Sequence, residues 1–332
     1  MQLFFFASGY FYKIENEQNI KGYIVKKIKK LLIPCLLYNL FYGMINTLLY
    51  KIGFSIGEKF NLFDWLLSPF MFGSNFKFNS PDWFIAQLFI VEVINVLIRK
   101  LLCDRAKRNG QIISFLFIFL GVLVTCFGWN GELSALVKIL FRTIFCLSWY
   151  AIGILYKKYE VYDKLNNYVY FVAVFSMQLM LLVYNKGNVS GSVVGFSFGI
   201  EPWQVYMTAL LGIAFWLRLC KIIASGMKDN RVISYIGRHT FSIVENQYLG
   251  IFILNTILLF INRKVENGIG FVEEYYFTRH NYIFIYRDIM NFPILYLVFG
   301  ITVPLAISLC GERCREKFLV NFGEKIYGKR KN

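Results

Sequence analysis

Eight long apolar runs constrain this chain more than any other feature of its sequence. Each approaches or reaches the ~20 residues that a helix needs to cross a bilayer. They cover 31–53, 82–102, 112–128, 137–156, 168–184, 203–223, 240–262 and 284–310. Hydrophobic residues make up 57% of the sequence and charged residues only 17%, too apolar a balance for a soluble core. The sequence therefore predicts an all-α, polytopic transmembrane helical bundle, formed by a single membrane domain over residues 1–332.

The basic residues alternate between the two sides of this bundle. Loops 13–30, 99–111, 157–167 and 221–238 and the tail 311–332 carry 25 of the 36 Lys and Arg residues. The intervening loops, around 51–81, 129–136, 185–202 and 263–283, carry 7. Cytoplasmic loops are enriched in Lys and Arg, so the first set and the C-terminus are expected in the cytoplasm of a multi-pass plasma-membrane protein. Basic residues spread over separate membrane loops exclude a nucleic-acid partner, and the sequence contains no metal-ligand cluster.

The segment 1–12 is apolar but too short to span alone, so we expect an N-terminal partial span. With the orientation fixed by charge, this segment runs from the outer side towards the cytoplasm. We therefore expect the domain to be N-terminally incomplete, with one further span preceding Met1. A weak bias towards Lys, Ile, Asn, Phe and Tyr is typical of an AT-rich bacterial genome.

Charged residues within spans are costly in lipid and often line a cavity. Glu92, Arg142 and Glu245 lie deepest, and both a functional cavity and a structural pairing remain open for them. The basic run Lys26–Lys30 enters a helix from the cytoplasmic side, where it could bind phosphate or simply anchor the helix. His239 precedes a predicted helix as a capping neighbour, and His280 lies in an outer loop.

Four stretches, in this order, resemble the acyltransferase-3 family of membrane proteins that O-acylate sugars and surface polysaccharides. They are Leu3-Phe-Phe-Phe-Ala-Ser-Gly-Tyr-Phe11, Lys26 to Pro34 with the following Cys-Leu-Leu-Tyr38, Ser80-Pro-Asp-Trp-Phe-Ile-Ala-Gln-Leu-Phe89, and Tyr235-Ile-Gly-Arg-His-Thr-Phe-Ser-Ile243. The resemblance implies acetyl-CoA or another acyl-CoA as donor substrate, no bound cofactor, and a surface polysaccharide or glycolipid as acceptor. It places Lys27 and Lys30 at the donor phosphates and Trp83 in the outer-leaflet motif.

The sequence departs from the family pattern at two places. The family's first helix, which carries an Arg and the catalytic His, would precede Met1. Gln247 stands where the family often has a second His, and an amide cannot exchange a proton near neutral pH. The catalytic residue is therefore unknown, and Trp83, Glu92, Arg142, Glu245 and Gln247 are the candidates for lining the cavity. The alternative is a catalytically inactive or truncated relative that acts as a membrane assembly or glycan-transport protein.

Overall fold

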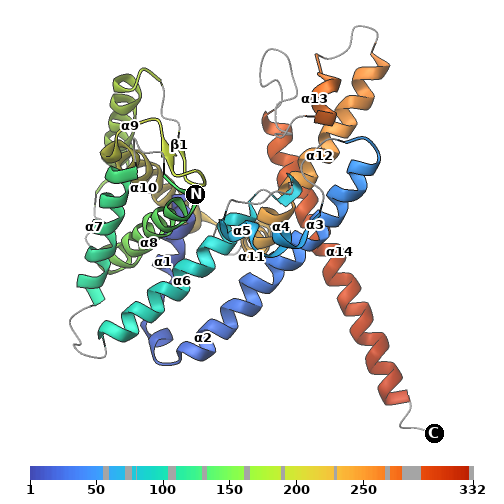
Figure 1. Cartoon of the computed structure of the whole chain (residues 1–332), viewed down its shortest axis with the longest axis horizontal. Helices are drawn as coiled ribbons and strands as arrows, with labels where there is room; N and C mark the ends of the chain where they lie inside the picture. Colours follow the sequence, from blue (N-terminus) through green and yellow to red (C-terminus); the bar gives the residue numbers. More distant parts are fainter. Residues whose placement is uncertain are drawn as a thin grey trace. The chain divides into compact units, whose positions relative to one another are not determined.

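The computed structural model consists almost entirely of helices (Figure 1). It describes residues 1–328 except 55–59, 72–76, 80, 104–109, 129–132, 161–164, 188–190, 228–229, 266–269 and 279–292. Predictions for His280 and for residues 284–292 of the last predicted span lie outside the described residues.

Seven helices among the described residues are long and apolar enough to cross a membrane. They are Ile20–Lys51, Gly110–Gly128 (α7), Ala135–Tyr159 (α8), Asn167–Tyr184 (α9), Pro202–Gly226 (α10), Thr240–Lys264 (α12) and Pro293–Arg313. An eighth predicted span forms α6, Asp82–Cys103, whose 22 residues include Asp82, Glu92, Arg99 and Lys100. The prediction of an all-α, polytopic membrane bundle is confirmed.

The N-terminal basic loop is shorter than the sequence predicts. Within 13–30 the chain forms a 3-10 turn, η1 (Ile14–Glu17), and then α2 (Ile20–Lys27), which begins at the side-chain cap of Asn19. A π-helical turn, η2 (Ile28–Leu32), joins α2 to α3 (Ile33–Lys51). Lysine is a good helix former, so the basic run extends the membrane helix instead of ending it.

Two further departures from the prediction lie in loop 185–202 and in the C-terminal tail. Loop 185–202 contains an antiparallel hairpin, in which β1 (Gly191–Ser192) pairs with β2 (Ser197–Phe198). The predicted cytoplasmic tail is helical as far as Gly328, because α14 runs over Pro293–Gly328. Short helices lie between the spans: α4 (Leu62–Leu66), α5 (Ser68–Met71), η3 (Lys77–Asn79), α11 (Arg231–Arg238) and α13 (Glu273–Thr278).

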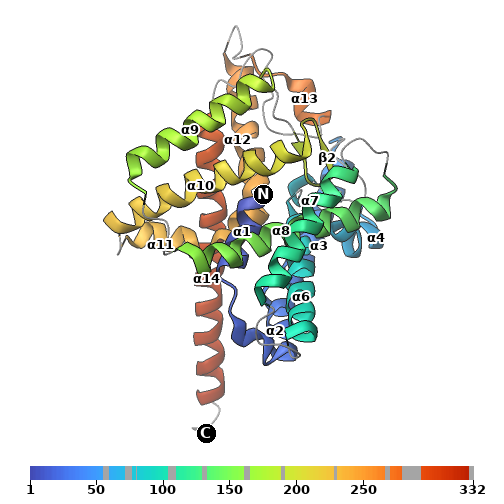
Figure 2. The ribbon, with the colours of Figure 1, turned by 90° about the vertical axis from the view of Figure 1, so that its left-hand side faces the viewer.

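The chain divides into two compact units, which are described here one at a time. Unit 1 comprises 1–36, 66–73 and 83–228, and unit 2 comprises 37–65, 74–82 and 229–332. In unit 1, α1 (Gln2–Tyr10) and α7 both pack on α8, and α9 lies alongside α10 (Figure 2).

Glycines bring the central helices of unit 1 into close contact. A Cβ atom at Gly153 would lie 2.0 Å from the Phe6 carbonyl oxygen, and one at Gly9 would lie 1.9 Å from the Tyr150 carbonyl oxygen. On the other side of α8, a Cβ at Gly121 of α7 would lie 2.3 Å from the Ser148 Cβ. Small residues at such crossings let helix backbones approach within a membrane, where packing must replace the hydrophobic effect.

Unit 2 is built on the pairing of α12 with α14. A Cβ at Gly250 would lie 2.3 Å from the Phe299 carbonyl oxygen, so this crossing also depends on a glycine. Beside it lies a hydrophobic cluster of buried residues from α3, η3, α12, α13 and α14. Its members include Tyr42, Phe78, Leu254, Tyr276 and Tyr296.

Candidate functional site

Lys27 and Glu92, two candidates far apart in the sequence, form an ion pair in unit 1. The Lys27 Nζ lies 2.6 Å from Glu92 Oε1, and it also lies 5.4 Å from the centre of the Tyr23 ring. Glu92 is 3% exposed, whereas the Lys27 side chain remains 24% exposed. A buried carboxylate needs a cation beside it, so this contact fixes the end of α2 against α6.

Lys30 lies close to Lys27 in the sequence but is exposed, as is Lys29. Lys27 directly precedes the π turn, whereas Lys29 and Lys30 lie within it. The N–H of Ile33 donates to the carbonyl of Ile28, five residues earlier, which widens the turn between Lys27 and the next lysines. Consequently, Lys27 is held by a carboxylate while Lys30 remains open to an anionic ligand.

Arg142 and Trp83 are brought together at a second position in unit 1. The guanidinium carbon of Arg142 lies 5.7 Å from the centre of the Trp83 ring, within cation–π range. Its Nε donates to Gln87 Oε1 at 3.1 Å, and Gln87 in turn donates to the Thr143 hydroxyl at 2.9 Å. Arg142 is only 1% exposed and Trp83 5%.

The other Arg142 nitrogens bind two loops. Nη2 donates to the carbonyl of Phe70 in α5 at 2.7 Å, and Nη1 donates to the carbonyl of Val194 in the β1–β2 turn at 3.4 Å. All these acceptors are neutral oxygens. Among the described residues no carboxylate forms an ion pair with Arg142, so its charge is stabilised by dipoles and by the Trp83 ring.

Glu245 and Gln247 lie on α12, which belongs to unit 2. Glu245 is fully buried, and its carboxyl interacts with that of Asp82 at the start of α6. The half-buried Gln247 donates to the carbonyl of Val244 at 3.2 Å. The neighbouring Asn246 accepts a hydrogen bond from the Tyr42 hydroxyl.

His239, the capping neighbour of the sequence analysis, is the N-cap residue of α12. Its Nδ1 lies 2.8 Å from the Tyr235 carbonyl and its Nε2 lies 3.0 Å from Glu312 Oε1. The hydrogen bond to Tyr235, with the Glu312 carboxylate, raises the pKa of His239 above its ordinary value. The imidazole is therefore engaged at both nitrogens.

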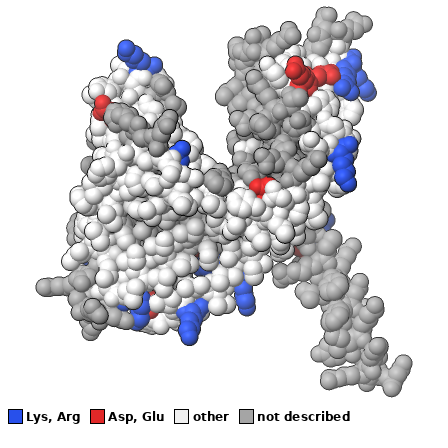
Figure 3. All heavy atoms as spheres, in the orientation of Figure 1, with Lys and Arg blue, Asp and Glu red and all other residues white. Residues whose placement is uncertain are grey.

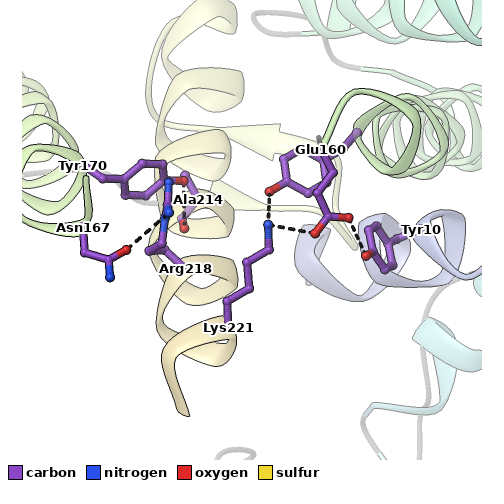
Figure 4. A network of polar contacts seen from close by, with 8 residues as sticks. Tyr10, Glu160, Asn167, Tyr170, Ala214, Arg218 and Lys221 are labelled. Atoms are coloured by element: carbon purple, nitrogen blue, oxygen red, sulfur yellow. Dashed lines mark hydrogen bonds and ion pairs between the residues drawn. The ribbon is translucent and has the colours of Figure 1, made fainter. Parts of the chain in front are cut away.

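A polar network that the sequence analysis missed joins α1, α8 and α10 (Figure 4). The Lys221 Nζ lies 2.8 Å from Glu160 Oε1, and the Tyr10 hydroxyl donates to Glu160 Oε2 at 2.6 Å. The hydrogen bonds from Lys221 and Tyr10 hold the pKa of the Glu160 carboxyl below its ordinary value. All three residues lie near helix ends, where sequence reasoning assigns charges to the membrane surface without pairing them.

A cavity of about 900 Å³ opens at one end of unit 1. It is lined by the η1 segment, by the junction of α6 and α7, and by the end of α8. Its lining residues are Tyr12, Lys13, Ile14, Glu15, Arg99, Gly110, Gln111, Ser114, Ile154, Leu155, Lys157 and Lys158. Lys27, Lys30, Trp83, Glu92 and Arg142 are not part of this lining.

Arg99 forms a wall of this cavity, although the sequence analysis treated it as an ordinary loop cation. It is 4% exposed, and its guanidinium donates to Asn95 Oδ1, to the Gly110 carbonyl and to Ser114 Oγ. Asn95 and Arg99 are four residues apart and therefore share a face of α6, a spacing that could have indicated this pairing. No group of three His, Cys, Asp or Glu side chains within the described parts of the chain could hold a metal ion.

The fold and these clusters define a multi-pass membrane protein with buried charged side chains on several of its long helices. Residues 1–311 match the acyltransferase domain of the acyltransferase 3 family, and the chain belongs to that family. Membership implies an acyl donor. No curated protein and no solved structure matches the chain.

Proposed function

We propose that this protein is a membrane O-acyltransferase. It transfers acetyl from cytoplasmic acetyl-CoA to a hydroxyl of an extracytoplasmic polysaccharide or lipid-linked glycan. The match to the acyltransferase domain over residues 1–311 carries this proposal, because it extends across all eight predicted spans. The charge bias supports a donor site at the Lys-rich helix ends.

Lys30, with Lys27 behind it, is the proposed phosphate-binding pair. Lys30 is exposed at the predicted cytoplasmic entry of the Ile20–Lys51 helix, where an ammonium can bind a donor phosphate as a point charge. Lys27 contributes a second positive charge while its ion pair with Glu92 keeps that part of the helix in place. Lys30 is therefore the residue whose loss should weaken donor binding without loss of packing.

The proposed reaction is nucleophilic acyl transfer. The acceptor hydroxyl oxygen attacks the thioester carbonyl carbon, its proton passes to a general base, and the carbon–sulfur bond breaks to release the CoA thiolate, which takes up a proton. No residue is assigned as the base. Trp83 and Arg142 are proposed to line the acceptor side of the pathway. Trp83 belongs to the outer-leaflet motif of the family, and Arg142 is the buried cation beside its ring.

Acetylation in cells tests the transfer. The chain is expressed in a bacterium whose own envelope O-acetyltransferase gene is deleted, and radiolabelled acetyl in the polysaccharide is measured. We expect label above that of the empty vector and an approximately tenfold loss in Lys30→Ala, the size expected for one charged hydrogen bond. Lys186→Ala, which removes an exposed lysine from a predicted outer loop, is the matched control.

Binding of labelled acetyl-CoA to the purified protein separates the donor site from the chemistry. Lys27→Met combined with Glu92→Gln replaces the ion pair by neutral side chains, so no buried carboxylate is left without its cation. Weaker binding in this pair and in Lys30→Ala, but not in Lys186→Ala, would support the donor site. Equal binding by all variants would remove it.

One observation favours a second candidate, a non-catalytic family member that assists membrane assembly or glycan transport. Gln247 stands in the place of a family histidine and bonds within its own helix. This candidate predicts acetyl-CoA binding without label in the polysaccharide, and Gln247→His would not create transfer. Label above background in the wild-type chain would exclude it.

A further inference from the structure

The cavity at the end of unit 1 joins positive charge to apolar surface. Four of its lining residues are cationic, Lys13, Arg99, Lys157 and Lys158, and one, Glu15, is acidic. The other large side chains of the lining are mainly apolar: Tyr12, Ile14, Ile154 and Leu155. Such a lining suits a ligand that has a negative group attached to a hydrocarbon part.

Glu15 is the one carboxylate in the lining that the structure describes, so positive charge predominates in this cavity. Among the described residues no carboxylate forms an ion pair with Lys13, Lys157 or Lys158. The Lys157 Nζ lies 6.0 Å from the centre of the Tyr10 ring, a contact that leaves its charge uncompensated. Clustered cations repel one another, so an anion between them would lower the energy of the site.

Exposed apolar side chains lie on the segments that form this cavity. Ile14, in the lining itself, is 75% exposed, and its near neighbour Phe11 is 73% exposed. Leu101 and Ile112, which are close in sequence to Arg99 and Gln111, are 70% and 62% exposed. Figure 3 shows Lys and Arg atoms gathered along one edge of unit 1 below a largely uncharged surface. The cavity thus lies where membrane hydrocarbon meets the predicted cytoplasmic headgroup layer.

We propose that this cavity binds the phosphate-bearing headgroup of an anionic phospholipid. Lys13, Lys157 and Lys158 contact the phosphate, and Ile14, Ile154 and Leu155 contact the upper part of an acyl chain. Basic pockets between transmembrane helices on the cytoplasmic side suit such headgroups, because the leaflet there is rich in anionic lipid. This lipid site is separate from the proposed donor site and does not depend on the protein being an enzyme.

Lipid retention by the full-length protein tests the proposal. Protein purified in detergent is mixed with equal amounts of phosphatidylglycerol and phosphatidylcholine, and bound lipid is measured by native mass spectrometry. We expect preferential retention of phosphatidylglycerol, reduced about tenfold or more in Lys157→Gln/Lys158→Gln, in line with the attraction expected per lysine. Lys51→Gln/Lys186→Gln, which makes the same charge change at exposed sites outside the lining, should retain the lipid as wild type does.

Two results would overturn the lipid assignment. The first is equal phosphatidylglycerol retention by the Lys157/Lys158 variant and by its control. The second is displacement of the lipid by saturating acetyl-CoA, which would assign the phosphate contacts of this cavity to the donor instead. Lys13→Gln provides an independent variant on a different segment, and it should lower retention in the same direction.

Discussion

The two units use the same packing device but differ in how they bury ionisable side chains. Each has a helix crossing in which a glycine faces a backbone carbonyl, Gly153 with Phe6 in unit 1 and Gly250 with Phe299 in unit 2. Unit 1 buries a guanidinium, Arg142, surrounded by neutral oxygens. Unit 2 buries a carboxyl, Glu245, beside a second one. The difference indicates that close helix packing is general here, whereas the buried polar groups distinguish the units.

The largest expected effect tests the shared packing device. Gly153→Ala puts a methyl group 2.0 Å from one backbone carbonyl oxygen, and Gly250→Ala puts a methyl group 2.3 Å from another. Neither oxygen can move alone. We expect each to lower the free energy of unfolding by about 1–3 kcal/mol or more, the cost of overpacking. Thermal unfolding of the purified protein in detergent measures this loss.

Gly212→Ala is the matched control for those variants. Gly212 also lies within a long helix, α10, but a Cβ there would meet no atom within 4 Å. Alanine is the better helix former by roughly 1 kcal/mol, so this variant should unfold at the wild-type temperature or higher. If all three variants behave alike, the close crossings contribute nothing specific to stability.

The next effect separates the two buried charges. Arg142→Met keeps much of the side-chain volume but leaves the carbonyls of Phe70 and Val194 without their donor. We expect the free energy of unfolding to fall by about 2–4 kcal/mol, because buried polar groups are costly when unsatisfied. Lys138→Met, one turn earlier on α8, removes a half-buried cation without these contacts and serves as the control.

Glu245→Gln should have the opposite outcome in unit 2. Two carboxyl groups buried beside each other repel when both are charged, and an amide removes that repulsion. The variant should therefore be as stable as wild type or about 1 kcal/mol more stable. A loss as large as that of Arg142→Met, measured by the same unfolding assay, would show that both units need their buried charge for folding.

The smallest effect concerns the pH dependence of unit 2. The pKa of His239 is raised above its ordinary value of about 6.5, while the adjacent Arg238 acts in the opposite direction. The stabilisation from His239 and Glu312 is thus complete below that ordinary value and is lost as the pH rises through the raised one. Because the Glu312 side chain is 54% exposed, the contribution should be about 0.5 kcal/mol or less.

Comparison of wild type with His239→Gln isolates this contribution from all other titrations. We expect the two proteins to differ in thermal unfolding at pH 5.5 and to converge at pH 8.5. Glu312→Gln should reproduce only part of this behaviour, because the hydrogen bond to the Tyr235 carbonyl, the larger cause of the raised pKa, remains. A difference that grows with pH would contradict the assignment.

Most of the fold could be predicted because the length of each apolar run in the sequence indicates a membrane-spanning helix. The spans from α6 to α12 lie within a few residues of the predicted ranges. The glycine crossings could not be predicted, since each depends on a backbone approach between segments distant in the sequence. The π turn after Lys27 could not be predicted either, because the apolar pattern of the sequence does not distinguish it from an α-helical turn. The hairpin in loop 185–202 was equally hidden by its short strands.

The candidate residues were predictable as types but not as partners. Glu92 and Arg142 were recognised because charge is rare in apolar spans, yet only the fold shows that one meets Lys27 and the other meets Gln87 and Trp83. Arg99 was assigned to a loop, because its burial depends on Gly110 and Ser114 of the next helix, α7. The sequence therefore predicts which charged residues are unusual, whereas it does not predict most of their interaction partners.

The π turn also determines which changes in its sequence this helix can accommodate. Its wider turn, from Ile28 to Leu32, rotates every later side chain relative to Lys27, compared with an unbroken α-helix. Deletion of a single residue in this turn would restore a regular α-helix and leave the following residues of α3 facing their present neighbours, because a π turn accommodates one extra residue. The segment can therefore lose one residue without changing how α3 packs, and it carries no large buried side chain of its own.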